Sequence, residues 1–528
     1  MGIFGAIMKI VMIVLVSVLT VFIILGAILM IFPSVSIFGL HYISCNYDSE
    51  MAEYLRSEES AQTKAMWDNA DFYRVETRGY DVLIRVKETG QRGETYQAGS
   101  LASVVNSSYK GFVWGGDAYK PTYSSSIKEN RYIEENGQNI FFVKMSEPDG
   151  FLVRSETLLT LVVETNTFAD KKLEINTQGG NVTIGGDINN AEKLINTNNL
   201  KINAGTGTVT LANMSVSENL EITKKSGNIK SEKNIDAKTT ITISEKYGLI
   251  ELLDIGTAEN PQKATIKTTN NTHTTIKNVY GGFEFKADRG LLEVDNITDF
   301  TDLNVGSCDS KIKNIQNGLN VVGGDGYVKI QDITGEATIT MKNGSVTLDK
   351  ASKKVVFESE NGGLKISDAG GDVYANTTRG NIDVNCAGNT INLNINNKHG
   401  NTNFTGAKGQ VLINTSSDFD AKGTGSITGT FTEISGNSSI FGYAGDINLT
   451  VPQNSWLLSW RNVQGEVNIK MGDLDTKERT TSGYLKDTSN TEKWIDVVTM
   501  LQSEKQTDSN TLLVTNNSGK INITASLA

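Results

Sequence analysis

Short stretches of alternating aliphatic and polar residues recur along most of the chain, and each follows a glycine. The pattern is Gly-x-Φ-x-Φ, where Φ is aliphatic, as in residues 180–184 and 290–294. Between Gly326 and Gly380 the copies recur every 18 residues, and elsewhere they recur every 20 or 21. Alternation with a period of two predicts β-strands that bury one face, and glycine permits a left-handed turn before each strand. The chain is thus predicted to be a tandem repeat of short strands.

Repeats of this length cannot bury an apolar face alone, so they are expected to stack. Stacked coils about 4.8 Å apart pair each strand in parallel with its equivalents above and below, which satisfies the backbone. Proline interrupts such a ladder; between residues 171 and 450 it occurs once, as Pro261, and tryptophan does not occur there. The sequence therefore predicts an all-β fold, a parallel β-helix or β-solenoid with coils of about 18–21 residues, over residues 155–470.

The alternative fold is a series of antiparallel β-sandwich domains, which also contain short strands and frequent turns. Strands in two different sheets have no reason to share a fixed register, whereas glycines at intervals of 18 residues do share one. The stacked fold is therefore favoured. In that fold Val346, Ile366 and Ile382 are predicted to face inward, and Thr347 outward.

A long apolar segment precedes the repeats. Residues 10–32 carry no formal charge, and a transmembrane helix needs roughly 20 apolar residues. The alternative is a cleaved signal peptide, whose apolar region is usually about 7–15 residues long. Lys9 precedes the segment and acidic residues follow it, so residues 1–9 are predicted to be cytoplasmic and the bulk extracytoplasmic. We expect a single-pass protein of the cell membrane, in contact with lipid through residues 10–32.

Residues 33–70 are predicted to form a membrane-proximal linker with a short stalk helix. Between residues 47 and 69, apolar side chains stand at helical spacing among many charged ones. A partner-binding helix is the alternative, but a solvated spacer accounts for the pattern.

The two ends of the repeat region are predicted to be capped. Residues 71–154 are expected to be a β-rich cap, with strands at 72–76 and 82–86 that lack the repeat. Residues 471–528 are expected to hold an insertion, a capping helix at 491–502 and a final strand. Such covers hide the open strand edges of a solenoid.

Two groups of segments resemble a known family. Residues 159–163 and 173–177 followed by Gly-Asn-Val, and residues 447–452 followed by 463–467, are similar to the putative-adhesin family of bacterial envelope proteins. The resemblance covers roughly residues 155–527. It implies a β-solenoid of unknown function, often carried behind one membrane anchor, and it transfers no catalytic residue.

Charge excludes one class of partner. The chain carries 49 Lys and Arg against 60 Asp and Glu, a net charge of −11. Binding to nucleic acid depends on a basic excess, so no nucleic-acid partner is expected.

Residues that perform catalysis or bind metals are few. The three histidines, His41, His273 and His399, give neither a Ser/His/Asp arrangement nor a metal-ligand spacing. His273 and His399 are interpreted as exposed turn residues. Gly323-Gly324-Asp325-Gly326 is similar to a calcium-binding β-roll turn, but the tandem nine-residue repeat is missing. No catalytic, cofactor or metal residue is assigned, and no small-molecule cofactor is expected.

Paired carboxylates are the one catalytic option, because some enzymes that act on polysaccharides use a parallel β-helix. The candidates lie close together in sequence: Asp295, Asp299, Asp302, Asp309, Asp325 and Asp332. In a chain with 60 acidic residues such clusters also arise by chance.

Cysteine usage predicts no structural disulfide. Of Cys45, Cys308 and Cys386, the last two lie 78 residues apart. Four coils separate them by about 19 Å, beyond the ~7 Å Cα limit of a disulfide. Cys386 shares the parity of Ile382 and is predicted to point inward.

Two functions remain open. The first is a membrane-anchored, extracytoplasmic β-solenoid that acts as a structural or adhesin-like binding protein of the cell envelope. Its partner would be a glycan, a cell-wall polymer or another protein. The alternative is an envelope enzyme that acts on a polysaccharide. The sequence favours a binding protein that is not an enzyme.

Overall fold

The computed structural model describes most of the chain. The described residues are 2–32, 35–37, 39–54, 61–86, 102–114, 122–146, 153–185, 194–415, 423–452, 456–471, 474–475, 482–485, 494–495 and 510–525. They form two compact units, Met1–Lys233 and Asn234–Ala528, each of which is considered by itself. This boundary falls inside residues 155–470, which the sequence analysis treats as one body.

The structure is mostly β, with 58% of residues in strands and one long apolar helix at the N-terminus. Helix α1 (Gly2–Ile31) contains a stretch, Ile7–Ile31, that is long and apolar enough to cross a membrane. A signal sequence meets the same criteria of length and composition. The helix agrees with the apolar segment expected at residues 10–32.

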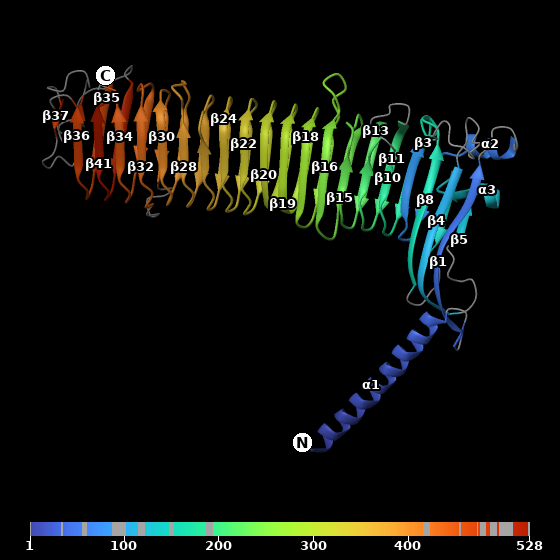
Figure 1. Cartoon of the computed structure of the whole chain (residues 1–528). Helices are drawn as coiled ribbons and strands as arrows, with labels where there is room; N and C mark the ends of the chain where they lie inside the picture. The colour runs from blue at the N-terminus through green and yellow to red at the C-terminus, as the bar shows by residue number, and fades with distance from the viewer. Residues whose placement is uncertain are drawn as a thin grey trace. The chain divides into compact units, whose positions relative to one another are not determined.

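In the unit Asn234–Ala528 the strands form two columns, and within each column every strand pairs in parallel with the next (Figure 1). One column contains β15 (Lys238–Ile243), β17 (Ala264–Thr268), β19 (Phe283–Ile297), β20 (Thr301–Ile315), β21 (Leu319–Gly323), β23 (Ala337–Met341), β25 (Val355–Ser359), β27 (Val373–Thr377), β29 (Leu393–Asn397), β31 (Val411–Asn414) and β33 (Asn437–Phe441). The other contains β16 (Gly248–Ile255), β18 (Thr272–Val279), the second halves of β19 and β20, β22 (Val328–Ile333), β24 (Val346–Ala351), β26 (Leu364–Ile366), β28 (Ile382–Asn385), β30 (Thr402–Ala407), β32 (Ile427–Phe431) and β34 (Ile447–Val451). We call one strand from each column, taken consecutively, a coil. The result is a large, mostly parallel sheet consistent with a β-helix.

The register of these strands follows the glycine spacing. Val346 pairs with Val328 on one side and with Leu364 on the other, each 18 residues away. Leu364 in turn pairs with Ile382. The interval of 18 residues predicted from the glycines is therefore confirmed as strand register.

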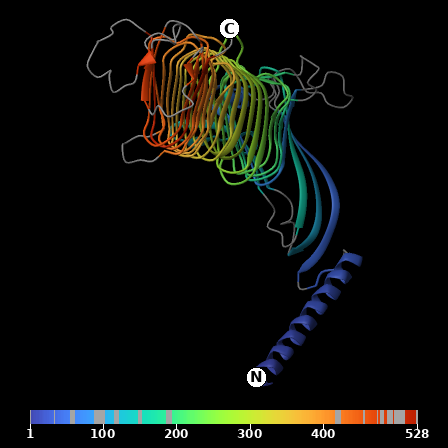
Figure 2. The same cartoon turned by 90° about the vertical axis from the view of Figure 1, so that its left-hand side faces the viewer.

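Alternate residues of the strands point into a narrow apolar interior. Val346, Ile366 and Ile382 are each no more than 1% exposed, as predicted, whereas Thr347 is only half-buried. Figure 2 looks along the stack and shows successive coils of this unit superimposed around that interior. Stacked Val, Ile, Leu and Phe side chains fill it, so burial of apolar surface stabilises every coil.

The glycine at each corner is required by close packing. A Cβ atom on Gly380 would lie 1.7 Å from the carbonyl oxygen of Gly362, and one on Gly362 would lie 1.9 Å from that of Gly344. Positive φ angles occur at Gly207 (85°) and Gly290 (134°) but not at these three positions. The left-handed turn predicted for the motif is thus correct for some copies, while in others glycine is needed because the next coil's backbone is so near.

A buried polar residue three positions before the glycine completes the corner. Thr377 Oγ1 accepts a hydrogen bond from Gly380 N (3.2 Å) and donates one to Gly362 O (3.0 Å). Asn397 Oδ1 accepts from Gly400 N (3.0 Å), and Asn462 makes the equivalent bond to Gly465. These side chains satisfy backbone groups that the turn leaves without strand partners.

The unit Met1–Lys233 has the same two-column arrangement. One column contains β7 (Gln138–Ser146), β2 (Phe72–Thr77), β9 (Lys172–Thr177), β11 (Ile195–Ala204) and β13 (Met214–Lys224). The other contains β8 (Val153–Val163), β3 (Asp81–Val86), β10 (Val182–Ile184), β12 (Val209–Leu211) and β14 (Ile229–Ser231).

The strands β2 and β3 belong to the repeat, so the prediction that they lack it is wrong. Val82 pairs in register with Val182, and the string Thr77-x-Gly79-x-Asp81-Val82 matches Thr177-x-Gly179-x-Asn181-Val182. The match escapes a search for Gly-x-Φ-x-Φ because Tyr80 stands where the later copy has Gly180.

The coils nearest each end of the chain do not stack in sequence order. Residues 72–86 lie between the coil formed by β7 and β8 and the coil formed by β9 and β10. Likewise β40 (Thr511–Asn516) lies between β33 and β35 (Leu457–Asn462), and β41 (Ile521–Ala525) lies between β34 and β36 (Val467–Met471). Each of these two coils therefore has paired neighbours on both sides.

Antiparallel strands cover the outer coils. Strand β8 pairs with β4 (Ala102–Trp114), while β7 pairs with β5 (Thr122–Ser125) and β6 (Ile133–Glu135), which flank the short helix α3 (Ser126–Glu129). At the other end, β35 pairs with β38 (Ser482–Leu485) and β36 with β37 (Leu474–Asp475). Covered edges leave fewer open backbone groups for other chains.

Two predicted helices need correction. The stalk helix is present only as α2 (Ala61–Asp68), because residues 40–54 form β1 (Leu40–Tyr54), antiparallel to β4. Within the predicted capping helix at 491–502, the structure describes Trp494–Ile495, and these form the strand β39, antiparallel to β38. Pairing with a neighbouring strand overrides local helical spacing in both cases. The remainder of 491–502 lies outside the described residues.

The register predicts opposite effects at two adjacent residues. Val346→Asp places a charge in the apolar interior and is expected to cost several kcal/mol of unfolding free energy. Thr347→Asp, on the opposite face, is expected to cost less than about 1 kcal/mol. Chemical denaturation of both variants measures the difference, and equal losses would contradict the register.

Lys224 predicts a pH-dependent stability. Its side chain is 1% exposed, its Nζ donates to Gly207 O (2.7 Å), and burial lowers its pKa to about 8 from 10.5. Between those two values the unfolded chain binds more protons, so this group's contribution to stability rises with pH. Lys224→Met is expected to raise the unfolding free energy by about 2–3 kcal/mol at pH 7 and by little above pH 10.5.

Thermal and chemical unfolding at several pH values measures this difference between variant and wild type. The matched control is Lys225→Met, because Lys225 is the exposed neighbour. A gain from Lys224→Met that stays constant across the pH range, or that also appears in the control, would contradict the assignment.

Candidate functional site

The outward faces of the coils carry polar ladders that run from one coil to the next. Asn343 Nδ2 donates to Asp325 Oδ1 (2.6 Å), and Asn361 Nδ2 donates to Asn343 Oδ1 (2.7 Å). Arg379 Nη1 then donates to Asn361 Oδ1 (3.2 Å). Each step joins residues 18 positions apart, so the strand register determines which side chains meet.

The acidic cluster considered for catalysis is bonded in the same way. Four of its members interact with a residue 18 positions later: Asp295 with Lys313 (2.5 Å), Asp299 with Asn317 (2.9 Å), Asp302 with Asn320 (2.9 Å) and Asp309 with Tyr327 N (2.8 Å). Asp325 begins the ladder described above. Asp332 Oδ1 is buried and has no hydrogen-bond partner among the described residues. The carboxylates therefore bond along the stack, and none of the printed contacts joins two of them.

The histidines lie apart from one another in the sequence and in their contacts. His273 is exposed but lies in β18, not in the turn predicted for it, with Nε2 3.3 Å from Glu293 Oε2. His399 is in a turn, and its Nδ1 lies 3.2 Å from Thr424 Oγ1. His41 is in β1. Among the described residues, no group of three His, Cys, Asp or Glu side chains is arranged to hold a metal ion.

The described thiols are buried and free. Cys308 and Cys386 are each 0% exposed, so the inward direction predicted for Cys386 is confirmed. Burial raises the pKa of Cys308 to about 12 and that of Cys386 to about 11. Both thiols remain protonated at neutral pH, which makes them poor nucleophiles. The side chain of Cys45 lies outside the described ones.

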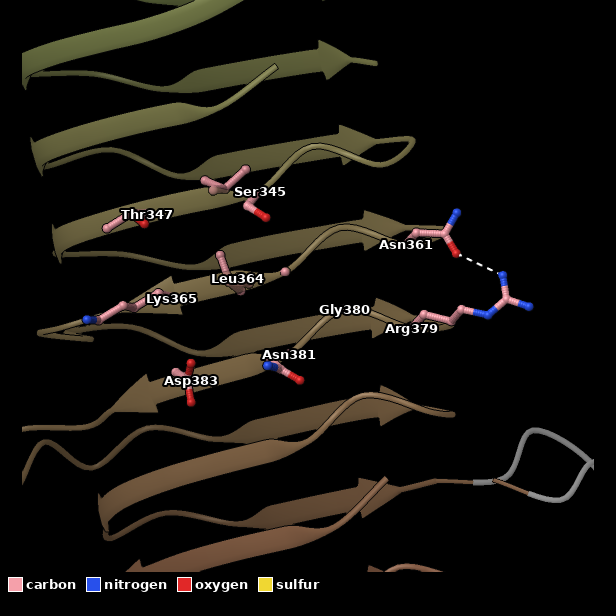
Figure 3. Close-up of a pocket in the computed structure, with 11 residues that line it drawn as sticks. Ser345, Thr347, Asn361, Leu364, Lys365, Arg379, Gly380, Asn381 and Asp383 are labelled. Carbon is pink, nitrogen blue, oxygen red and sulfur yellow. Dashed lines mark hydrogen bonds between the residues drawn. The ribbon is translucent and has the colours of Figure 1, made fainter. Parts of the chain in front are cut away.

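A polar groove with a volume of about 360 Å³ crosses three coils of the unit Asn234–Ala528 (Figure 3). Its central row consists of Ser345, Gly363 and Asn381, which immediately precede the paired residues of β24, β26 and β28. Thr347, Lys365 and Asp383 line one side, and Asn361 and Arg379 line the other. The backbone beneath is formed by Val346, Leu364 and Gly380.

The groove is hollow because Gly363 has no side chain. A Cβ atom there would lie 2.9 Å from the carbonyl oxygen of Asn381, so the backbone of the next coil excludes larger residues. The flanking positions in the row are a small serine and an asparagine, and Asn381 Oδ1 accepts from Asn401 N (3.0 Å). Packing between coils thus keeps the middle of the row open.

Two cations stand on opposite sides of this hollow. In Figure 3 the side chains of Lys365 and Arg379 extend in opposite directions from the strands. Both are exposed, and within the described part of the chain neither has a carboxylate within 4 Å. Asp383 is already bonded, since its Oδ1 accepts from Asn403 Nδ2 (2.6 Å).

Other lysines of this unit are paired. Lys311 Nζ lies 3.1 Å from Glu293 Oε1, and this hydrogen bond lowers the pKa of Glu293. Lys263 Nζ lies 3.2 Å from Glu284 Oε2 and lowers the pKa of Glu284 in the same way. The cations of the groove differ from these in keeping their charge available to a ligand.

An aromatic side chain adjoins the groove. Tyr327 precedes Val328 and is therefore one coil before Ser345 in the central row. Its ring is 38% exposed, and its hydroxyl donates to Thr347 Oγ1 (3.0 Å), which lines the groove. A partly exposed aromatic face fixed by its own hydroxyl offers an apolar surface to a ligand.

The sequence analysis missed this groove. It treated Thr347 only as an outward residue and Asp325 only as an acid, and it did not single out Gly363, Lys365 or Arg379. The available signal was the row of residues one position before each inward aliphatic: tyrosine, serine, glycine and asparagine in successive copies. The fall and rise in side-chain volume along that row indicates a hollow.

Comparison with known proteins gives little further information. No family model and no curated protein matches the chain. Among solved structures, a "putative cell adhesion protein" from Clostridium sporogenes is similar at 9% sequence identity, covering 90% of this chain and 100% of that chain, with a TM-score of 0.15. A TM-score this low supports no argument about fold or function.

Proposed function

We propose that this protein is a membrane-anchored, extracytoplasmic β-solenoid that binds a partner at the cell envelope and does not catalyse a reaction. The observation that carries the proposal is the groove over Gly363, where an exposed, unpaired lysine and arginine are presented on a rigid parallel ladder. Partners consistent with such a surface are a glycan, a cell-wall polymer or a protein.

The arrangement of strands supports the solenoid. Every coil repeats the same two columns, the same inward apolar positions and the same corner. Each coil thus buries its apolar side only against its neighbours, which is the property that distinguishes solenoids from other all-β folds.

Helix α1 supports the anchor. None of its most hydrophobic 18-residue window is buried inside the protein, and side chains such as Phe22 and Ile31 are more than 60% exposed. A helix with apolar residues on all sides is stable in hydrocarbon and unfavourable in water. The acidic residues that follow it place the larger part of the chain outside the cytoplasm.

The state of the carboxylates favours binding over hydrolysis. A glycosidase needs two carboxyl groups facing each other across the substrate, about 5–10 Å apart. In the acidic cluster, Asp299, Asp302 and Asp325 each accept a hydrogen bond from an asparagine one coil on. These groups stabilise the stack, and their bonds run along it.

The topology predicts the pattern of proteolysis. Protease added to intact cells from which the wall has been removed is expected to degrade nearly all of the protein, leaving a fragment that contains α1. Immunoblotting with antibodies against the unit Asn234–Ala528 measures the loss. Full protection of that unit in intact cells, with degradation after lysis, would show that the topology is wrong.

The binding interpretation predicts retention without turnover. The full chain in neutral detergent, incubated with cell-wall and capsular polysaccharides, is expected to release neither new reducing ends nor unsaturated sugars. Asp295→Asn and Asp325→Asn are expected to leave this result unchanged. Product formation that either substitution abolishes would favour the enzyme.

A further inference from the structure

The groove over Gly363 combines charge, hydroxyl-binding groups and an aromatic face. We propose that it binds a segment of an acidic polysaccharide, with Lys365 and Arg379 contacting anionic groups on successive sugar units. This inference rests on the binding function proposed above and names the ligand class of that site.

The charges determine the sign of the ligand. Lys365, Arg379 and Asp383 give the groove a net charge of +1, on a chain whose net charge is −11. Arg379 has five N–H donors, and its one bond within the described residues is to Asn361. Its free donors suit a carboxylate, which a guanidinium binds through two parallel hydrogen bonds.

The position of the charges determines the size of the ligand. Lys365 and Arg379 lie on opposite sides of the central row, so one small anion cannot contact both with short bonds (Figure 3). A polymer with a negative charge on each unit can place two groups there at once. Binding through two linked contacts is stronger than through either alone, so a polymer is expected to bind more tightly than its monomer.

The remaining groups suit a hydroxyl-rich chain. Ser345 Oγ and Asn381 Nδ2 have no hydrogen-bond partner among the described residues, and the second oxygen of Asp383 is not used by Asn403. These groups donate to and accept from sugar hydroxyls. The volume of about 360 Å³ lies within the range of ligand sites, roughly 300–1,000 Å³. The ring of Tyr327 provides an apolar face beside them.

The ladder from Asp325 holds the arginine in place. Asp325 accepts, Asn343 and Asn361 relay, and Arg379 donates, in steps of 2.6, 2.7 and 3.2 Å. Asn361 is therefore a positioning residue for Arg379. Its replacement leaves both cations present but releases the guanidinium from its support.

The experiment compares matched polymers. The full chain in neutral detergent is titrated calorimetrically with polygalacturonate, its methyl ester, monomeric galacturonate, dextran and poly(glycerol phosphate). We expect polygalacturonate to bind more tightly than the monomer, and the uncharged ester and dextran to bind weakly. The affinity is expected to fall as salt is raised.

The variants test the location. Lys365→Gln with Arg379→Gln is expected to weaken binding of polygalacturonate at least about tenfold, since each charge-assisted hydrogen bond contributes roughly 1.5–3 kcal/mol. The matched control is Lys277→Gln with Lys286→Gln, which removes the same charge from exposed lysines on β18 and β19. This control is expected to change affinity less than about twofold. Thermal unfolding verifies that all variants are folded.

Several outcomes would overturn the assignment. Equal losses in variant and control would mean that binding depends on overall charge and not on the groove. Equal binding of polygalacturonate and its methyl ester would exclude an anionic ligand. Preference for poly(glycerol phosphate), with the same loss in the variant, would retain the anionic polymer and replace carboxylate by phosphate as the recognised group. Polygalacturonate binding unaffected by the double substitution would overturn the groove but not the proposed binding function.

Discussion

Each strand of a coil is hydrogen-bonded in parallel to the equivalent strands of the coils on both sides, and this ladder determines the positions of all other groups. Equivalent side chains are held about 4.8 Å apart. On the inner face that spacing stacks Val346 against Val328 and Leu364 in apolar contact. On the outer face it brings amides within hydrogen-bond distance of carboxylates one coil away. At the corner it leaves room only for glycine.

The same ladder creates a problem wherever the stack ends, because an outer strand exposes one row of backbone groups. In both units the chain places a later or earlier coil outside the terminal one and then adds antiparallel strands. Residues 72–86 and residues 511–525 thus lie one coil inward from an end. Neither coil can acquire both of its neighbours until the chain has folded back over it. Completion of each end therefore depends on contacts between residues distant in sequence, which form slowly.

Sequence reasoning succeeded where a structural requirement recurs at a fixed interval. Gly362 and Gly380 read directly as register, and parity then oriented Ile382 and Cys386 correctly. It failed where the interval was interrupted: the coil at 72–86 is separated by 100 residues from its equivalent at 172–184, with Tyr80 replacing the glycine. It failed at residues 47–54 because pairing with β4 outweighs helical spacing. The insertion order at both ends has no local signal at all.

The groove was hidden for a different reason, because it is made by outward residues of three coils and no single repeat contains it. Its chemistry nevertheless follows from the ladder. A carboxylate only accepts hydrogen bonds, a guanidinium only donates them, and an amide does both. A column that begins at Asp325 and passes through Asn343 and Asn361 can be extended by a donor, and Arg379 is that donor. Because the arginine has no acceptor to offer the next coil, the column ends there. Its remaining N–H groups face the groove side of the protein, where only a ligand or water can accept them.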